Sequence, residues 1–210
     1  LTILDIGVGT GRIIKHLSSI PEIWDCIEYY TGIDNNDNCI ALARENMAAL
    51  QLGQKVSILK LEAKGIGSLQ KKYDIIMTTW FTPGNFYPAD FDFASYDPVK
   101  KRLSLKSNPA FTQVWTTACK MLKKNGIVIL GSCYYDNNST RLKQENFYKQ
   151  LGMTLITNDK DSFTATKEGF WSQRFTLAII RKYLKNAGFR SISQIPLDTY
   201  KFAFQVHLLK

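Results

Sequence analysis

The chain begins with a glycine-rich turn between a strand and a helix. The run Leu4-Asp5-Ile6-Gly7-Val8-Gly9-Thr10-Gly11 sets three glycines at alternate positions, preceded by an acidic residue. Glycine has no Cβ, so it lets the main chain turn sharply and approach a bound molecule closely. The residues that follow, 12–17, have a helical pattern, so the turn joins the carboxyl end of a strand to a helix N-terminus. This arrangement predicts a nucleotide-type site in an open α/β sheet.

The spacing of the glycines narrows the choice of ligand. A dinucleotide fingerprint requires glycine at position 12, which is Arg12, and a phosphate-binding P-loop requires a Gly-Lys-Ser/Thr sequence that is absent from the run. The observed D-x-G-x-G-x-G resembles motif I of the class I S-adenosylmethionine-dependent methyltransferases. The alternative is a glycine-rich turn that binds no ligand. The resemblance implies S-adenosyl-L-methionine as the cofactor and S-adenosyl-L-homocysteine as its product.

A second acidic residue follows the next predicted strand. Asp34 comes directly after Thr31-Gly32-Ile33, and a carboxylate at this place can accept hydrogen bonds from both ribose hydroxyls. The resemblance assigns Asp34 to the ribose of the cofactor, with Asn35 beside it to orient the nucleoside. The other interpretation of Asp34 is an ordinary turn residue.

The same resemblance implies the remaining cofactor contacts. Asp5 organises the glycine loop near the methionine moiety, and Gly7, Gly9 and Gly11 lie beneath the ligand. Glu62 and Ala63 follow the third strand, where the family often has an acidic and a small residue at the adenine edge. Aspartate is more common than glutamate there, and a plain surface glutamate is the alternative. Thr79, after the fourth strand, completes the expected set.

Candidate acceptor-binding residues are aromatic or polar and follow predicted strands. The segment after the fourth strand borders the transferred methyl group, and it lacks the Asn/Asp-Pro-Pro-Tyr/Phe sequence of amino-directed DNA methylases. Aromatic faces favour a cationic sulfonium or amine, and an arginine can pair with a carboxylate through two hydrogen bonds. For the aromatic residues, packing in the core or a lid is the alternative, and Pro83-Gly84 can form a plain turn. The candidates are Trp80, Asn85, Tyr134, Trp171 and Arg174.

The catalytic residues remain unknown, and the reaction explains why none is evident. A sulfonium methyl group is already activated, so the protein chiefly aligns donor and acceptor and excludes water. The cysteines and the two histidines show no metal-ligand spacing, so we expect no metal site. We expect reduced thiols that are mostly buried, in a cytoplasmic protein.

Strands and helices alternate through most of the chain, which predicts a mainly parallel sheet. We expect a three-layer α/β/α Rossmann-like fold with seven strands, the last antiparallel, as the resemblance implies. The segment 80–108 is irregular and too long to be a simple connection. The expected strands are 2–6, 29–33, 55–61, 73–78, 127–133, 189–195 and 202–209. The expected helices are 11–20, 37–50 with Asp37 as N-cap, 109–124, 140–151 and 175–186.

The length and the net charge of the chain limit its domain organisation and the classes of function that it can have. The 210 residues fit a single methyltransferase domain, 1–210, that starts inside a strand and is expected to lack its natural N-terminal segment. No apolar run approaches the ~20 residues that span a bilayer. The first hypothesis is methylation of N or O in a small molecule. The net charge of +9 supports the alternative, an RNA methyltransferase. A non-enzymatic cofactor-binding or degenerate regulatory protein is the third possibility. Motif I does not specify the acceptor, and the oligomeric state is unknown.

Overall fold

A computed structural model of the chain describes residues 1–100 and 102–210. The central sheet has the order β3-β2-β1-β4-β5-β9-β8, and β9 runs antiparallel to both β5 and β8. The predicted seven-stranded, mainly parallel sheet is therefore confirmed. The strands are β1 (Thr2–Ile6), β2 (Tyr29–Asp34), β3 (Val56–Lys60), β4 (Tyr73–Thr78), β5 (Leu122–Tyr135), β6 (Phe163–Ala165), β7 (Trp171–Phe175), β8 (Ser191–Pro196) and β9 (Ala203–Leu209).

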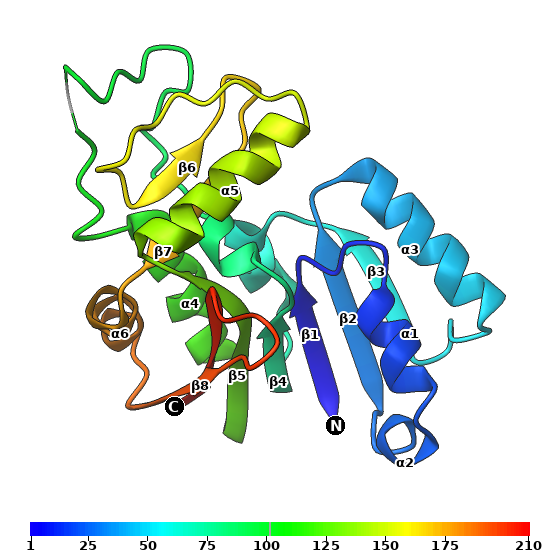
Figure 1. Cartoon of the computed structure of the whole chain (residues 1–210). Helices are drawn as coiled ribbons and strands as arrows, with labels where there is room; N and C mark the ends of the chain where they lie inside the picture. Colours follow the sequence, from blue (N-terminus) through cyan, green and yellow to red (C-terminus); the bar gives the residue numbers. More distant parts are fainter. Residues whose placement is uncertain (101) are drawn as a thin grey trace.

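Helices cover both faces of this sheet (Figure 1). They are α1 (Arg12–Ser18), α2 (Pro21–Trp24), α3 (Asp37–Ala49), α4 (Pro109–Met121), α5 (Asn138–Gln150) and α6 (Leu177–Asn186), with 3₁₀ helices η1 (Ala63–Leu69) and η2 (Thr82–Asn85). Two neighbouring residues of β1 show why helices lie on both faces of the sheet. Ile3 packs into a cluster with Ile14 of α1 and Met47 of α3, whereas Leu4 packs into a cluster with residues of α4 and α6. Successive strand residues point to opposite faces, so a continuous apolar run suits a strand that is buried on both sides.

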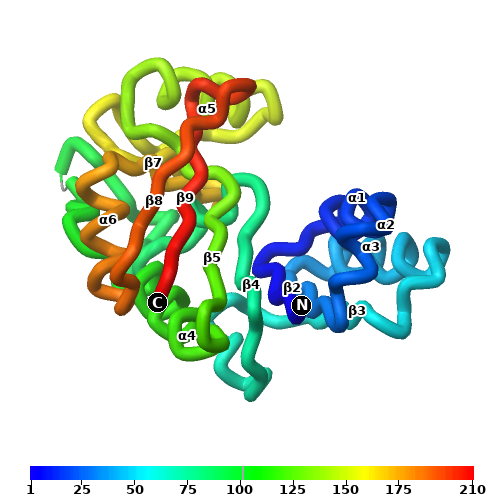
Figure 2. Tube along the Cα trace, turned by 90° about the horizontal axis from the view of Figure 1, so that it is seen from below, coloured from blue at the N-terminus to red at the C-terminus, as the bar shows by residue number. Residues whose placement is uncertain are grey.

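A hairpin extends the sheet to nine strands, and its second strand, β7, was not predicted from the sequence. Strands β6 and β7 pair antiparallel, and β7 adds to the end of β5 through Tyr134–Arg174 and Tyr135–Phe175. The hairpin, α5 and residues 86–100 and 102–108 gather at the carboxyl end of the sheet, above β5 (Figure 1). Seen from below, this half of the molecule lies on the other side of β4 from the half that holds α1–α3 (Figure 2), and the pairing of β1 with β4 joins the two.

Several predicted boundaries are wrong. The helix expected at 109–124 ends at Met121, and Asn125-Gly126, interpreted as its end, lies inside β5, where the pairing with β4 is irregular. The last helix starts at Leu177, because residues 171–175 form β7. Asn36 caps α3 in place of Asp37: its side chain accepts the Cys39 amide hydrogen bond.

Two other expectations concern the thiols and the segment 80–108. Only Cys119 and Cys133 are buried, whereas Cys39 is half-buried and Cys26 exposed, so the thiols are not mostly buried. The segment is irregular apart from η2, and its Lys101 lies outside the described residues.

Candidate functional site

A cleft of about 500 Å³ opens beside the glycine loop at the carboxyl ends of β1 and β4. Four of the residues predicted to hold cofactor or acceptor lie in it together: Gly7, Gly9, Thr79 and Trp80. Its other lining residues are Val8, Thr10, Arg12, Ile13, Cys39 and Thr82. The carboxyl edge of an open α/β sheet is where such folds bind ligands.

Left-handed backbone favours glycine in this loop, and steric crowding is a second reason at Gly7. Gly7 has a φ of +81°, and a Cβ there would lie 2.8 Å from Oγ1 of Thr82. Gly9 has a φ of +56°, and a Cβ there would meet no atom within 4 Å. Left-handed φ values favour glycine at both positions. The open space over Gly9 fits a ligand that lies directly on the main chain.

Asp34 connects the end of β2 to this loop. Its Oδ2 accepts a hydrogen bond from the amide of Gly9 at 2.9 Å, and its Oδ1 accepts one from the amide of Asn36 at 3.0 Å. An ionised carboxylate has about four acceptor positions, so both oxygens keep capacity for ribose hydroxyls. Asp34 is thus near the loop and able to accept further hydrogen bonds.

Asp5 lies fully buried behind the loop. Its Oδ2 accepts a hydrogen bond from the Tyr30 hydroxyl at 2.7 Å, whereas its Oδ1 has no partner among the described residues. Burial raises the pKa of Asp5 to about 7, the Tyr30 hydrogen bond opposes that rise, and the negative charge of Asp34 adds to it. Asp5 is therefore a buried carboxyl group with one unsatisfied oxygen, two residues before Gly7 of the glycine loop.

Asp5 and Asp34 are not among the residues that line the cleft, and the remaining predicted cofactor residues also lie outside its lining. Gly11 is buried, and a Cβ there would contact Met47, so it packs α1 against α3. Asn35 is exposed. Glu62 is exposed and pairs with Lys64 at 2.6 Å, and Ala63 starts η1.

Trp80 lies at the mouth of the cleft in an unusual conformation. Its φ is +53°, in the left-handed region that bulky residues rarely adopt, and its residue surface is 44% exposed. The guanidinium carbon of Arg12 lies 4.6 Å from the centre of its ring. Strained backbone of this kind persists where the surrounding structure holds it, often at functional sites. Arg12 and Trp80 together close one side of the cleft.

Trp80 belongs to a group of five rings that we call the aromatic cluster: Trp80, Phe81, Tyr134, Tyr200 and Phe202. Phe81 and Tyr134 stack with ring centres 3.8 Å apart and planes within 6°. The Phe202 ring lies 6.0 Å from each of these two rings. Tyr200 contacts both Trp80 and Phe202 edge to face. The cluster joins segments after β4, at the end of β5 and before β9.

Trp171 and Asn85 do not join this cluster. Trp171 is 4% exposed and stacks on Phe163 at 4.0 Å inside a small hydrophobic core that also includes Leu105. Trp171 therefore lies in a core away from the cleft, where Tyr87 and Phe91 pack against its ring. Asn85 is exposed at the end of η2 and is absent from the lining of the cleft.

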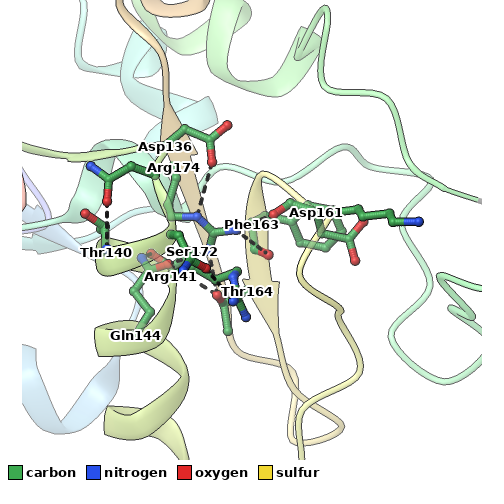
Figure 3. Close-up of polar contacts among 12 residues, drawn as sticks. Asp136, Thr140, Arg141, Gln144, Asp161, Phe163, Thr164, Ser172 and Arg174 are labelled. Atoms are coloured by element: carbon green, nitrogen blue, oxygen red, sulfur yellow. Dashed lines mark hydrogen bonds and ion pairs between the residues drawn. The ribbon is translucent and has the colours of Figure 1, made fainter.

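Arg174 is also buried outside the lining of the cleft. The side chain is 1% exposed, and all five of its N–H donors make hydrogen bonds within the protein (Figure 3). None is left for a bidentate pair with a substrate carboxylate, so Arg174 instead fixes the hairpin to β5 and α5. Its acceptors are Asp136 Oδ1 (3.3 Å), Gln144 Oε1 (2.8 Å), Thr164 Oγ1 (2.8 Å) and the carbonyls of Asp161 and Phe163.

Sequence analysis missed several residues of the site. Arg12 directly follows motif I, and this position in the sequence is a signal that could have assigned it to the site. Phe81 follows Trp80, but Tyr200 and Phe202 are distant in sequence and carry no motif. Within the described residues no group of three metal-ligating side chains occurs, and none of the described helices is long and apolar enough to cross a membrane.

The sheet order and the glycine loop define a class I methyltransferase fold, and comparison with known proteins agrees. A family model described as a methyltransferase domain matches residues 1–188, so the chain belongs to this family. Its members are S-adenosylmethionine-dependent methyltransferases, and S-adenosylmethionine is the cofactor. No curated protein matches the chain.

Solved structures share the fold at low sequence identity. The CcbJ methyltransferase from Streptomyces caelestis has a TM-score of 0.64 at 12% identity, over 99% of this chain and 82% of that one. A S-adenosylmethionine-dependent methyltransferase from Clostridium acetobutylicum scores 0.61 at 13% identity, with coverage of 99% and 82%. A putative O-methyltransferase from Nostoc punctiforme scores 0.61 at 15% identity, and this chain spans 51% of its length.

Proposed function

We propose that this methyltransferase transfers the methyl group to an oxygen or nitrogen of a small molecule. The observation that carries the proposal is the aromatic cluster, because Trp80 belongs both to it and to the lining of the cofactor cleft. A compact surface of rings beside the donor suits a small organic acceptor. Two similar folds are described as O-methyltransferases, which is in keeping with this proposal.

The cofactor assignments form part of the proposal. Gly7, Gly9 and Thr79 would contact the cofactor in the cleft, Asp34 would accept the ribose hydroxyls, and Asp5 would face the methionine end from behind the loop. Asn35, Glu62 and Ala63 would need to reach the nucleoside from outside the cleft lining. When bound, the cofactor supplies an electrophilic methyl group, and the residues align the acceptor and exclude water.

We also propose that the whole chain forms one methyltransferase domain. The family model ends at residue 188, but β9 pairs with β5 in the middle of the sheet from Ile127–Leu209 to Tyr134–Ala203. The residues after the matched region are therefore part of the same sheet.

One assay separates the acceptor classes. The protein is incubated with S-adenosylmethionine labelled at the methyl group, together with either a metabolite extract or total RNA. Label in small, nuclease-resistant products supports the proposal. Label that appears only in RNA supports the alternative that the net charge of +9 favours. Calorimetric titration with S-adenosylhomocysteine, run in parallel, establishes that the preparation binds the cofactor product.

A further inference from the structure

Four of the five exposed aromatic residues in the described part of the chain lie close together. Phe147 is 57% exposed and Phe170 is 49% exposed, the next two are Trp80 and Tyr200, and the fifth, outside the group, is Tyr87. A single exposed apolar side chain needs no explanation, but a contiguous group of them marks an interaction surface. The contacts between these residues show that the group is contiguous.

The group begins at the C-terminal part of α5. The ring centre of Tyr148 lies 5.7 Å from that of Phe147 and 6.3 Å from that of Phe170, which belongs to the turn between β6 and β7. Leu151, one helical turn after Phe147, is also exposed. The helix and the turn of the hairpin therefore present exposed apolar side chains next to each other.

Lys143 connects these residues to the rim of the cofactor cleft. It precedes Phe147 by one helical turn, and its Nζ lies 4.7 Å from the centre of the Phe202 ring. The Tyr200 ring lies 5.7 Å from the Phe202 ring and 6.3 Å from the ring of Trp80, which lines the cleft. Figures 1 and 2 both place α5 beside the connection between β8 and β9, which carries Tyr200. We call the exposed apolar residues of this series the apolar surface: Trp80, Phe147, Leu151, Phe170 and Tyr200.

Cations outnumber carboxylates around the apolar surface. Four exposed cations lie next to its residues, and two exposed carboxylates lie among them. The cations are Arg12, Lys143, Lys167 and Lys201, and the carboxylates are Glu168 and Asp198. Both oxygens of Glu168 also accept the hydrogen bond of the Thr154 amide at 3.1 Å, which ties that carboxylate to the protein. The apolar surface therefore has a positive border that attracts an anionic partner.

The rings at the rim of the cleft favour one kind of anionic partner. Phe81 and Tyr134 stack on each other, and Arg12 and Lys143 lie over the rings of Trp80 and Phe202, so these four rings have little free face for a nucleic-acid base. A second copy of the chain is also disfavoured, because an isologous contact would bring equal positive charges together. A bilayer interface needs neither ring faces nor a shaped pocket, since apolar side chains enter the headgroup region from their exposed edges.

We propose that the apolar surface docks on an anionic lipid bilayer. The exposed apolar side chains enter the headgroup region, and the surrounding cations lie at the level of the lipid phosphates. Trp80 belongs both to this surface and to the lining of the cofactor cleft, so the rim of the cleft is held close to the membrane. This inference goes beyond the proposed function and holds for any methyl acceptor.

Co-sedimentation with lipid vesicles tests the proposal without measuring activity. The vesicles contain either phosphatidylcholine alone or phosphatidylcholine with about 30% phosphatidylglycerol. We expect the protein to bind the anionic vesicles about tenfold or more tighter than the neutral ones, and this preference to shrink at high salt. Equal binding to both kinds of vesicle, or binding to neither, overturns the proposal.

Matched variants separate docking from a general attraction of the net charge. The double variant Phe147→Ser with Phe170→Ser keeps the charge and should bind anionic vesicles about tenfold more weakly. Lys143→Gln should weaken binding about fivefold. The controls are Leu142→Ser and Lys149→Gln, which change exposed residues of α5 that lie about 140–160° around the helix axis from Phe147. Controls that weaken binding as much as the matching variants overturn the proposal.

Tryptophan fluorescence tests the orientation of the docked protein. Vesicles that carry brominated lipid should quench Trp80, because it is exposed, whereas Trp115 and Trp171 are buried and Trp24 lies in α2, far from the apolar surface (Figure 1). Trp80→Phe should therefore remove most of the quenching. Quenching that remains undiminished in this variant overturns the proposed orientation.

Two further measurements identify another occupant of the apolar surface. A single-stranded RNA oligonucleotide that binds more tightly than anionic vesicles, and less tightly to the double serine variant, would assign the surface to RNA. A dimer in sedimentation velocity that the same variant dissociates would assign it to a second copy. Either result overturns the membrane proposal. Phe147 and Phe170 do not line the cleft, so the double variant should keep its affinity for S-adenosylhomocysteine, and absence of that binding in the wild type would count against the proposed function alone.

Discussion

Asp34 accepts a hydrogen bond from the amide of Gly9, 25 residues earlier in the chain, at 2.9 Å. This contact ties the end of β2 to the glycine loop at the end of β1. In the proposed function the same carboxylate would also accept the ribose hydroxyls, so the loop and the cofactor would be coupled through one side chain.

Replacing Asp34 with alanine should therefore weaken S-adenosylhomocysteine binding about tenfold or more, because hydrogen bonds to a charged acceptor are lost. Asp37→Ala is the control: Asp37 is exposed nearby at the start of α3 and pairs with Lys60. Calorimetry gives both affinities. An analogue without ribose hydroxyls separates loop effects from ligand effects: its loss of affinity in Asp34→Ala reports the change in the loop, and the larger loss expected for S-adenosylhomocysteine reports the ribose hydrogen bonds. Unchanged S-adenosylhomocysteine affinity in Asp34→Ala would falsify the ribose assignment.

Gly7→Ala should disrupt the loop. The new Cβ would combine a φ of +81° with a distance of 2.8 Å to Oγ1 of Thr82, so we expect a loss of about 2–4 kcal/mol in unfolding free energy. Cofactor binding should fall with it. Gly53→Ala is the matched control, because a Cβ at Gly53 meets no atom within 4 Å and its φ is not left-handed. Urea unfolding of the two variants decides the matter, and equal midpoints would contradict the expected strain.

The residues of this site that could be predicted from the sequence are those whose type is restricted by main-chain conformation or by position at the end of a strand. Gly7 and Gly9 are recognisable because their conformation and the close approach of a ligand restrict the residue type, and Asp34 because parallel strands end at one edge. The aromatic cluster lacks such a signal. Phe81 and Phe202 are separated by more than half of the chain, and only the antiparallel pairing of β9 with β5 brings them together.

Strand β7 shows why the fold prediction failed locally. Its residues Ser172, Gln173 and Arg174 are polar and yet buried, so the sequence has neither the alternation of a half-exposed strand nor the apolar run of a buried one. Their burial depends on partners from distant segments, such as Gln144 of α5 and Asn108 before α4. No local sequence pattern indicates that such distant partners are present.

Arg174→Met should destabilise the protein by about 3–5 kcal/mol, because it leaves a set of buried acceptors without their donor. Arg174→Lys should restore little, since an ammonium cannot replace five N–H groups held in one plane. Arg181→Met, on the exposed side of α6, is the control and should change stability by about 0.5 kcal/mol or less. Urea unfolding measures all three. If Arg174→Lys is as stable as the wild type, the hydrogen-bond network is not what holds the hairpin.

Asp5 should make stability depend on pH near neutrality. Its pKa in the folded protein is raised to about 7, above that of an unfolded aspartate, so between about pH 4 and about pH 7 the folded state binds more protons. Stability from this group is therefore lost as pH rises through that range, by on the order of 1–3 kcal/mol. Asp5→Asn cannot ionise and should lack this loss, so its unfolding free energy relative to that of the wild type should rise between about pH 5 and about pH 8.

Asp74→Asn is the opposite control. Lys123 and Thr2 lower the pKa of Asp74 to about 2, so its contribution is lost only as pH falls below the ordinary aspartate range. Urea unfolding at the two pH values should show a growing difference for Asp5→Asn and a constant one for Asp74→Asn. A constant difference for Asp5→Asn would mean that Asp5 is already ionised at the lower pH.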